Sequence, residues 1–374
     1  MEAGIRGTEQ LIQWASRWDD LGTPFLAMDR EALLDRVRAF SAYDDRCPSY
    51  YAVKANPDPA VVEVIAASSL GFEVSSEDEL TLLTGLGVSP DRIISSNPIK
   101  TPGFIEAMHA LGRREFVFDS AAEAEKLARL APCSDAVIRL TVDNLESSWP
   151  LADKFGVGPD DAHDMLLYAA KLGLVPSGIT FHVGSQCLGL DSWRRALQRA
   201  AGLWARLSDS GVSLRTLNVG GGFPAHHDDG IPTVPETFDL IFGLVSELFP
   251  AGVELRAEPG RGLVADAGVL VSSVIGKAVR ESTPWVYLDV GVFNGLMESV
   301  GGINYMFAPL APGGPQQRWT VAGPSCDSFD VIAKDVPLPD LEVGDRVLIH
   351  PAGAYTTAYA APFNGAVVPP VVLG

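Results

Sequence analysis

The sequence lacks several features that mark whole classes of protein. It has no apolar run near the length of a membrane span, and its first residues, "MEAGIRGTEQLIQW", lack the apolar core of a secretory signal. None of its four cysteines belongs to a CxxC motif or to a Cys/His pair with zinc spacing. We therefore expect a cytoplasmic protein without metal and without a disulfide framework. Cys47, Cys133 and Cys187 are expected to be reduced core thiols.

Positive charge is also scarce. Lys and Arg total 28 against 47 Asp and Glu, which gives a net charge of −19. This balance argues against nucleic acid or an anionic membrane as a partner, and it suits a soluble enzyme that acts on small molecules. The length of 374 residues predicts two domains, and the hydrophobic fraction of 47% is ordinary for globular cores.

Between residues 50 and 260, short β-branched or aromatic runs alternate with helical patterns. Eight such alternations in this length predict a (β/α)₈ barrel. A doubly wound open sheet is the alternative, but it usually has fewer strands and a GxGxxG turn after the first, which is absent. Ser75 and Ser120 are the expected N-caps of two of the helices. The predicted strands are "YYAVKAN" (50–56), "GFEVSS" (71–76), "RIISSNP" (92–98), "EFVFDS" (115–120), "AVIRLTV" (136–142), "GITFHVGS" (178–185), "TLNVGGG" (216–222) and "ELRAEPG" (254–260).

After residue 265 the pattern changes to strand-like runs separated by Pro/Gly turns, as in "AGVLVSSVIGKAVRE", "PWVYLDVGV", "QRWTVAGPSC" and "GDRVLIHPAG". The early run "GTPFLAMD" (22–29) is also strand-like. We therefore expect a barrel domain over residues 28–265 and an all-β domain that combines residues 1–27 with 266–374.

Polar side chains gather at the ends of the predicted barrel strands, the rim where chemistry sits in this fold. They are Lys54, Glu73, Asn97, Asp119, Arg139, His182, Ser185, Gly220–Gly222, Glu258 and Arg261. So many polar residues at one rim indicate a site.

The rim residues suggest a phosphate-bearing cofactor. The glycines of "NVGGGFP" can bring backbone N–H groups close to an anion, Arg261 can bind phosphate oxygens, and "GAYTTAY" (353–359) adds a tyrosine hydroxyl. A phosphate site together with the embedded Lys54 suggests pyridoxal 5′-phosphate (PLP) held as a Schiff base. Taken alone, each feature also has an ordinary structural reading: a tight turn for the glycines, or a lysine that snorkels to the rim.

PLP also needs a group at its pyridine nitrogen and a face for its ring. Glu258 is the candidate carboxylate, which would keep the nitrogen protonated. His182 in "FHVGSQ" is a candidate for stacking on the ring, although a lone histidine is more often a satisfied core residue. Ser185 is a candidate phosphate donor.

These motifs resemble those of the fold-type III PLP-dependent decarboxylases, the group that includes the ornithine/lysine, diaminopimelate and arginine decarboxylases. The resemblance runs from about residue 22 to the C-terminus and implies a TIM barrel with a β domain. "SSWPLADKFG" (147–156) and "YLDVGVFNGLMES" (287–299) are most similar to the bacterial ornithine/lysine branch. The matching motifs, in order, are "YAVKAN", "FHVGSQ", "NVGGGFP", "EPGR", "GPSCDSFDV" and "GAYTTAYAAPFNG".

The resemblance implies a role for each matching residue. Lys54 is similar to the Schiff-base lysine, His182 to the residue stacked on the ring, and Glu258 to the carboxylate at the pyridine nitrogen. Glu73 and Arg139 fall where the family supports the lysine and the cofactor, and many members have aspartate in place of Glu73. The implied phosphate contacts are Ser185, Gly221, Gly222, Gly260, Arg261 and Tyr355.

The motif "GPSCDSFD" (323–330) carries the remaining implied roles. In the family, its cysteine and aspartate reach the active site of the partner subunit. Cys326 would return a proton to the substrate carbon after CO₂ leaves, and Asp327 would contact the far end of the substrate. The resemblance thus implies a homodimer with shared active sites. Without it, the motif is a turn that bears a free thiol.

One segment departs from the family pattern. In the ornithine/lysine branch an acidic residue after "GLMES" binds the distal ammonium of the substrate, whereas Gly301 and Gly302 stand in this chain at that place. We expect decarboxylation of an L-amino acid with an amine-bearing or modified side chain. Two alternatives remain: a PLP-dependent racemase of the same fold, and a non-catalytic regulatory homologue. Glu258, Cys326 and Asp327 argue against a racemase, and the intact Lys54, Glu258 and Cys326 argue against a non-catalytic homologue.

Overall fold

A computed structural model describes residues 8–150, 154–225, 230–310 and 314–374. Within these ranges the chain forms two compact units. The first, here called the barrel unit, comprises Val37–Pro224 and Gly230–Gly262. The second, here called the β unit, comprises the residues before Val37 together with Ala225 and Leu263–Gly374. The helices α2 (Arg30–Ser41) and α10 (Arg261–Val264) include residues of both units.

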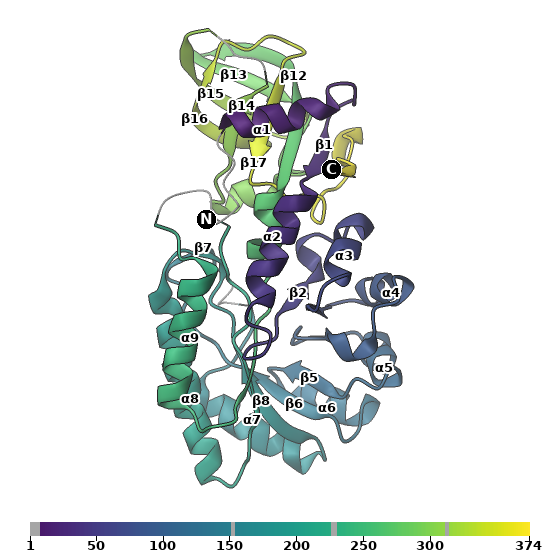
Figure 1. Cartoon of the computed structure of the whole chain (residues 1–374), viewed down its shortest axis with the longest axis vertical. Helices are drawn as coiled ribbons and strands as arrows, with labels where there is room; N and C mark the ends of the chain where they lie inside the picture. The colour runs from purple at the N-terminus through teal and green to yellow at the C-terminus, as the bar shows by residue number, and fades with distance from the viewer. Residues whose placement is uncertain (1–7, 151–153, 226–229, 311–313) are drawn as a thin grey trace. The chain divides into compact units, whose positions relative to one another are not determined.

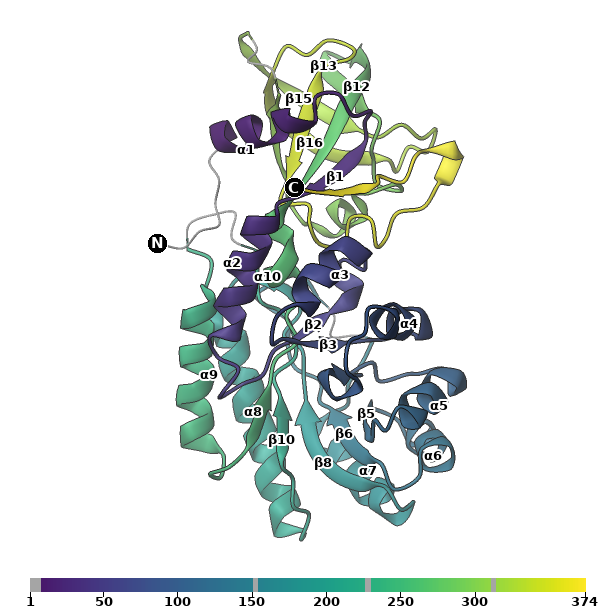
Figure 2. The ribbon, with the colours of Figure 1, turned by 45° about the vertical axis from the view of Figure 1, so that its right-hand side comes forward.

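Strands and helices alternate along the barrel unit, and the helices lie outside the strands (Figures 1 and 2). The strands are β2 (Tyr50–Ala52), β3 (Gly71–Glu73), β4 (Ile93–Ile94), β5 (Glu115–Phe118), β6 (Asp135–Arg139), β7 (Ser147–Trp149), β8 (Val175–Thr180), β9 (Ser185–Cys187), β10 (Thr216–Asn218) and β11 (Glu254–Arg256). The helices are α3 (Pro59–Ala66), α4 (Glu77–Gly85), α5 (Pro102–Ala110), α6 (Ala121–Leu130), α7 (Pro159–Lys171), α8 (Leu190–Asp209) and α9 (Val234–Leu248).

The barrel strands form two parallel sheets, with orders β2-β3-β4 and β11-β10-β8-β6-β5. A parallel bridge between Ser49 and Ala257 joins them on one side, supported by a hydrogen bond of 2.8 Å from Tyr50 N to Ala257 O. This nearly closed ring is the predicted (β/α)₈ barrel, and the open-sheet alternative is wrong. Six predicted strands contain an observed one, whereas β6 and β8 begin one and three residues before the predicted ranges 136–142 and 178–185. The observed strands are shorter than predicted, so most rim residues lie in the loops that follow them.

A buried lysine occupies the seam between β4 and β5, which are not paired in the described structure. Lys100 Nζ donates to Val117 O on β5 at 2.5 Å and to Asn97 O at 2.9 Å. Its ammonium also lies 3.1 Å from Oε1 of Glu123. These charge-assisted bonds connect the loop after β4 to β5, where the two strands are not paired by backbone hydrogen bonds.

Two serines precede α4, and the second of them is the N-cap. Ser76 accepts a hydrogen bond from the backbone N–H of Glu79, three residues on, so the prediction of Ser75 as N-cap was wrong. The hydroxyl of Ser75 instead donates to Oε1 of Glu73 at 3.1 Å. The predicted cap of α6, Ser120, is confirmed by its bond from the N–H of Glu123.

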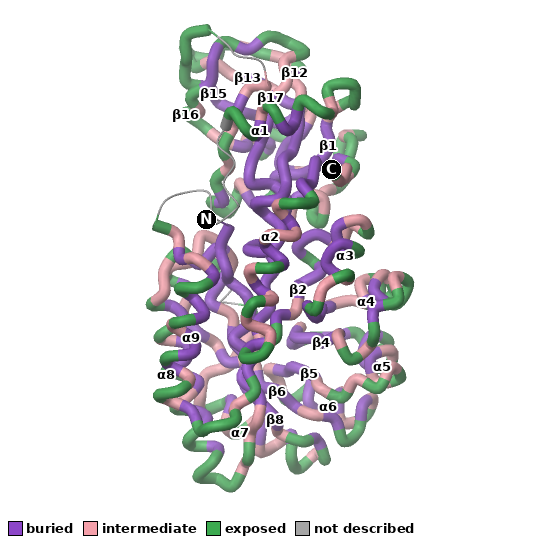
Figure 3. The backbone as a smooth tube through the Cα atoms, in the orientation of Figure 1, coloured by how far each residue is buried: buried purple, intermediate pink, exposed green. Residues whose placement is uncertain are grey.

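Burial follows the periodicity of each element (Figure 3). Helix α8 buries one face that carries Trp193, Leu197, Leu203 and Leu207. The ring of Trp193 lies 5.0 Å from that of Phe223. Such aromatic contacts fix α8, and therefore the loop before it, against the barrel.

The β unit contains one eight-stranded sheet of order β14-β17-β12-β13-β15-β16, in which β12 also pairs with β1 and β1 with β18. Pairing of Phe25–Met28 with Gly268–Val271 confirms that the early run joins the later β region. Helix α1 (Thr8–Ala15) packs into the core of this unit through Leu11 and Trp14. The strands are β1 (Phe25–Met28), β12 (Gly268–Arg280), β13 (Thr283–Leu288), β14 (Met306–Pro309), β15 (Gln316–Ala322), β16 (Val331–Pro339), β17 (Arg346–His350) and β18 (Val371–Leu373).

No helix in the described ranges has the length and hydropathy required to cross a bilayer.

Candidate active site

Lys54 follows β2 within a short 3₁₀ helix, η2 (Val53–Ala55), rather than extending the strand. Its ammonium lies 2.5 Å from Oε2 of Glu73, at the end of the neighbouring strand β3. The lysine side chain is 46% exposed, whereas that of Glu73 is 1% exposed. Lys54 is therefore not the buried amine that its apolar strand suggested. It is an accessible amine held by a buried carboxylate.

Glu73 is fixed from its other oxygen as well. Its Oε1 accepts hydrogen bonds from the hydroxyl of Ser75 at 3.1 Å and from the backbone N–H of Ser96 at 3.3 Å. A buried carboxylate with donors on both oxygens keeps one orientation, because rotation would leave its charge unpaired. Glu73 therefore fixes the place of the Lys54 ammonium.

Glu258 is a second buried carboxylate, two residues beyond the end of β11. Its Oε1 accepts from the hydroxyl of Ser96 and, at 2.6 Å, from Nδ2 of Asn218. Burial raises the pKa of Glu258, and the charge of Glu73 raises it further, while the donors Ser96 and Asn218 and the Lys54 ammonium act in the opposite direction.

Arg139, at the end of β6, adds positive charge to the same rim. Burial lowers the pKa of this guanidinium, and the carboxylates of Glu258, Asp119 and Glu73 oppose that effect. Arginine nonetheless stays protonated in proteins, so Arg139 offsets part of the negative charge of the two buried glutamates.

His182 is held as a neutral imidazole. Burial lowers its pKa well below the usual value, and the positive charges of Arg139 and Lys54 add to the effect. The backbone N–H of Gly184 points to Nδ1 of His182 at 2.9 Å, so Nδ1 is the acceptor and the ring proton belongs on Nε2. The predicted rim position of His182 is confirmed in a loop directly after β8.

The glycine run forms a backbone cradle beside these residues. Gly220 and Gly222 have φ angles of +65° and +116°, which favour glycine. A Cβ on Gly221 would lie 2.8 Å from Glu258 O and 2.9 Å from Nε2 of His182. Ser185 Oγ accepts a hydrogen bond of 3.1 Å from Nε of Arg261. A phosphate would fit here, because the glycines leave room for it and both Arg261 and Ser185 can donate hydrogen bonds to its oxygens. The residues of the barrel unit therefore suit the phosphate group of PLP.

Of the other four predicted site residues, Gly260 is buried in the barrel unit directly before α10, and Cys326, Asp327 and Tyr355 belong to the β unit. Cys326 is an exposed free thiol in the turn between β15 and β16. Asp327 Oδ1 accepts from the N–H of Phe329 at 2.8 Å within the same turn. Tyr355 has a φ of +55°, and its ring stacks on that of Tyr359 at 5.7 Å.

Asp330 holds the turn that bears Cys326 and Asp327. Its Oδ2 accepts from the N–H of Ser325 at 2.9 Å, and its Oδ1 accepts from the N–H of Val292 at 2.7 Å. A Cβ on Gly291 or Gly323 would come within 2.3 Å of this carboxylate, so both positions need glycine. One buried carboxylate thus ties the turn after β15 to the segment after β13.

Sequence reasoning missed four residues of this arrangement: Ser75, Ser96, Asn218 and Asp330. Ser96 and Asn218 lie inside the predicted strands 92–98 and 216–222, next to or near the named rim residues Asn97 and Gly220, which was a usable signal for further polar residues at the rim. Two other predicted rim residues, Asp119 and Asn97, accept hydrogen bonds from backbone N–H groups instead. Asp119 Oδ2 accepts from Gly156 N at 2.9 Å, and Asn97 Oδ1 accepts from Ile99 N at 3.4 Å.

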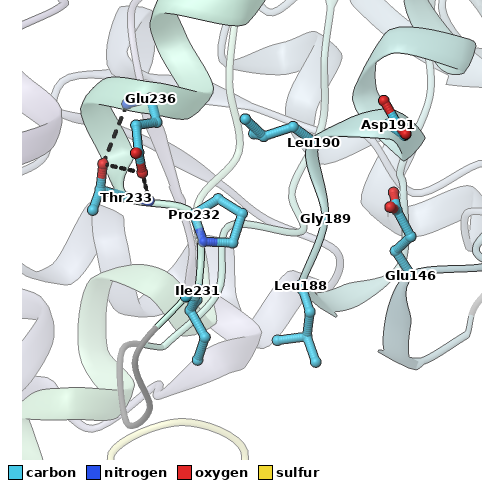
Figure 4. A pocket seen from close by; sticks show the side chains of 10 residues that line it. Glu146, Leu188, Gly189, Leu190, Asp191, Ile231, Pro232, Thr233 and Glu236 are labelled. Carbon is cyan, nitrogen blue, oxygen red and sulfur yellow. Dashed lines mark hydrogen bonds between the residues drawn. The ribbon is translucent and has the colours of Figure 1, made fainter.

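A separate pocket of about 570 Å³ lies between the loops that precede α8 and α9 (Figure 4). Two of its carboxylates accept hydrogen bonds from backbone N–H groups at the beginnings of α8 and α9. Glu146 Oε2 accepts from the N–H of Ser192 at 2.6 Å, and Glu236 forms a capping box with Thr233. Asp191, the third acidic residue of the lining, lies 3.5 Å from Nε of Arg194. Because these contacts account for the acidic groups, we assign no ligand to this pocket.

Comparison with known proteins agrees with the geometry. Residues 31–265 match the family described as "Pyridoxal-dependent decarboxylase, pyridoxal binding domain". The lysine/ornithine decarboxylase of Selenomonas ruminantium is 34% identical, over 94% of this chain and 89% of that protein.

Two solved structures extend the likeness to the whole chain. The lysine/ornithine decarboxylase of Vibrio vulnificus, complexed with cadaverine, has a TM-score of 0.89 and 29% identity, covering 99% of this chain and 100% of the other. The SrLDC structure with PLP and cadaverine has a TM-score of 0.87 and 31% identity, covering 99% and 95%. The chain belongs to the pyridoxal-dependent decarboxylase family and is a PLP-dependent carboxy-lyase.

Proposed function

We propose that this enzyme decarboxylates an L-amino acid whose side chain carries an amine or a modified amine, and releases the corresponding amine. The observation that carries the proposal is the pairing of the accessible Lys54 ammonium with buried Glu73, beside the buried Glu258 and the glycine cradle. We retain residues 28–265 as the proposed cofactor-binding domain, and residues 1–27 with 266–374 as the proposed β domain.

The barrel unit would hold PLP through residues with distinct tasks. Lys54 would bind the cofactor covalently through its amine, and Glu258 would hold a proton on the pyridine nitrogen. When bound, PLP supplies an electron sink for the pair left behind as CO₂ departs. The remaining proposed contacts in this unit are Glu73, Arg139, His182, Ser185, Gly221, Gly222, Gly260 and Arg261. The resemblance adds Tyr355, which belongs to the β unit.

The charges of the rim support this division of tasks. A neutral His182 carries no ammonium-like charge that would repel a protonated pyridine, so its ring face is available for stacking. Glu258, buried with donors to Oε1, is oriented to receive a charged N–H. The hydroxyl of Ser185 and the guanidinium of Arg261 can both donate hydrogen bonds to phosphate oxygens. Together with the backbone N–H groups of the glycine cradle, they would bind a phosphate more firmly than the cradle alone.

We assign proton return to Cys326 and contact with the distal amine to Asp327, both acting on the partner subunit's site in a homodimer. The surface around their turn supports an oligomer. Phe329 and Phe363 are 53% and 42% exposed, and both pack against Phe293, at 6.5 and 4.6 Å between ring centroids. Exposed aromatic side chains in one cluster are typical of an interface.

We also propose that the enzyme acts in the cytoplasm. The cysteines are free thiols, as expected in a reducing compartment. Cys47 and Cys187 are buried, but the prediction of Cys133 as a core thiol was wrong, because it lies exposed in the turn after α6 with a φ of +58°. The charge balance gives no support to nucleic acid or membrane partners.

An absorption spectrum and a CO₂-release assay test the proposal. The purified enzyme should absorb near the edge of the visible range, lose that band on borohydride reduction, and release CO₂ from an amine-bearing L-amino acid. Racemisation without CO₂ release would assign the enzyme to the racemase alternative. Absence of any bound cofactor would contradict the proposal altogether.

A further inference from the structure

Ser96 contacts both buried carboxylates of the rim. It lies two residues after β4 and is 6% exposed. Its backbone N–H donates to Oε1 of Glu73 at 3.3 Å, while its hydroxyl donates to Oε1 of Glu258. One residue therefore joins the carboxylate that holds Lys54 to the carboxylate proposed for the pyridine nitrogen.

The two carboxylates repel each other where Ser96 joins them. Glu73 is 1% exposed and Glu258 is 6% exposed, so water does little to screen their charges. The other charged and titratable groups around this pair are Lys54 after β2, Glu79 on α4, Arg139 on β6 and His182 after β8. Since His182 is neutral, Lys54 and Arg139 provide the positive charge.

Hydrogen-bond donors are the second means of keeping Glu258 ionised. The donors to Glu258 are Ser96 Oγ and Asn218 Nδ2, which also lies 3.5 Å from the serine oxygen. Both donors stabilise the ionised form of Glu258 and so oppose the rise in its pKa that burial and the charge of Glu73 cause. The backbone bond to Glu73 fixes the Ser96 main chain, so the hydroxyl is held at a defined place relative to both acids.

We infer that Ser96 is a positioning residue that keeps Glu258 ionised and aimed at the pyridine nitrogen, and that it couples this carboxylate to the Glu73–Lys54 pair. The inference deepens the proposed function and rests on it. Ser96 does not touch the reacting atoms in this scheme. It acts through Glu258, which would in turn determine whether the pyridine nitrogen keeps its proton.

The neighbouring Ser95 provides a matched control. It is 3% exposed, in the same loop, and its buried hydroxyl has no hydrogen-bond partner among the residues that the structure describes. Ser95→Ala and Ser96→Ala each remove one buried hydroxyl from adjacent positions. Only Ser96→Ala removes a donor from Glu258, so a difference between the variants reports that bond and not a general loss of packing.

The experiment measures PLP binding by absorbance and fluorescence between pH 5 and pH 9. Loss of a donor raises the pKa of a carboxylic acid. The acidic limb of the binding curve, the pH range in which PLP affinity falls as the solution becomes more acidic, should therefore move to higher pH for Ser96→Ala. Near neutral pH its affinity for PLP should fall about tenfold, the size expected for one hydrogen bond to a charged group. Ser96→Thr should restore the wild-type limb, and the weaker donor of Ser96→Cys should place it between wild type and Ser96→Ala.

A second readout uses the protein without cofactor. Thermal unfolding of Ser96→Ala should show a larger loss of Tm at pH 8, where Glu258 is more ionised, than at pH 5. Ser95→Ala should show the same loss at both values. If Ser96→Ala does not fold, Ser96→Cys serves in both measurements.

The outcomes separate this inference from the proposed function. If wild-type protein forms no borohydride-reducible adduct with PLP, the proposed function fails. If wild type forms the adduct, but the acidic limbs of Ser96→Ala and Ser96→Cys coincide with that of Ser95→Ala, the role of Ser96 is wrong. A displaced limb that Ser96→Thr returns to the wild-type position supports it.

Discussion

The Lys54 ammonium lies 2.5 Å from Oε2 of Glu73, and the two side chains differ sharply in exposure, at 46% and 1%. The carboxylate is fixed by Ser75 and Ser96, while the amine remains open to solvent. An amine that must form and release covalent bonds needs access, whereas its partner needs a fixed place. The pair has both properties.

We predict that Lys54→Ala abolishes turnover and also the adduct that borohydride reduces onto the protein, because no other amine would occupy that place. Lys171→Ala, at an exposed lysine in the last turn of α7, should leave both unchanged. Mass spectrometry after reduction measures the adduct directly. A cofactor adduct on Lys54→Ala would show that another lysine is the attachment site.

The sequence predicted the barrel because its strand–helix alternation is regular, and it predicted the rim because strand ends were readable. It misjudged the environment of Lys54, since an apolar run does not reveal that the strand ends at Ala52 and turns into a 3₁₀ helix. The sequence also misplaced the N-cap of α4 on Ser75. Ser75 and Ser76 are equally suitable by residue type, and only the folded backbone shows that the N–H of Glu79 donates to Ser76.

The hydrogen bonds that orient the site residues could not be predicted from the sequence. Ser96 and Glu258 are 162 residues apart, and Asp330 reaches Val292 across 38 residues. Such contacts depend on how strands neighbour one another, which local patterns do not specify. The resemblance to known decarboxylases supplied the roles of Cys326 and Asp327, for which an exposed thiol in a turn gives no local sign.

Asp330→Asn should impair turnover without affecting cofactor binding. Asparagine keeps the shape, but its amide nitrogen would face the N–H of either Ser325 or Val292, so one of the two bonds is lost. We expect kcat to fall roughly tenfold, with PLP affinity unchanged, because the turn that bears Cys326 loosens. Asp345→Asn is the control, since its carboxylate accepts from Glu342 N in another turn of the same unit. Equal effects of the two variants would contradict the positioning role.

The buried Lys100 should make stability depend on pH in the alkaline range. Burial lowers its pKa to about 8 in the folded protein, from the ordinary lysine value of 10.5. Between these values the unfolded chain binds more protons, so the free energy of unfolding should rise with pH. The difference of 10.5 − 8 = 2.5 units, at about 1.4 kcal/mol per unit, gives an upper value of about 3 kcal/mol.

Lys100→Met should remove this rise, which urea unfolding at pH 7.5 to 10 would measure. The control is Lys171→Met, which removes one exposed lysine in the last turn of α7. Its stability curve should run parallel to that of wild type. If the Lys100→Met curve is also parallel to wild type, Lys100 does not titrate in this range.

Subunit mixing tests the shared active site. Lys54→Ala and Cys326→Ala should each be nearly inactive, yet a mixture that exchanges subunits should recover activity, because hybrid dimers contain one site with both native residues. With equal amounts and random exchange, about a quarter of wild-type activity is expected for a twofold-symmetric dimer. Cys133→Ala, at the other exposed cysteine, should remain active. No recovery, once exchange has been demonstrated independently, would place each site within a single subunit.

The substrate prediction concerns the segment around Gly301 and Gly302. Met297–Gly301 forms a 3₁₀ helix, and Gly302 ends it with a φ of +95°, which disfavours a side chain there. The chain therefore offers no acidic side chain at the place where the resemblance expects one. Loss of a charge-assisted contact corresponds to about 1.5–3 kcal/mol, or roughly 10- to 150-fold in affinity. We predict that free ornithine and lysine are poor substrates, and that a derivative with a modified amine is better.

A CO₂-release panel should decide this, with ornithine, lysine, arginine, diaminopimelate and N-acylated forms compared by kcat/KM. Gly301→Asp should raise kcat/KM for free ornithine or lysine, because φ at this position does not restrict the choice to glycine and the new carboxylate can pair with a distal ammonium. Gly314→Asp adds the same charge to the β unit, at a site with open space around its Cα, and should change nothing. High kcat/KM of the wild type for free ornithine or lysine would mean that another group binds the ammonium. Asp327→Ala would then identify whether that group is Asp327, since removing the only distal contact should raise KM far more than it lowers kcat.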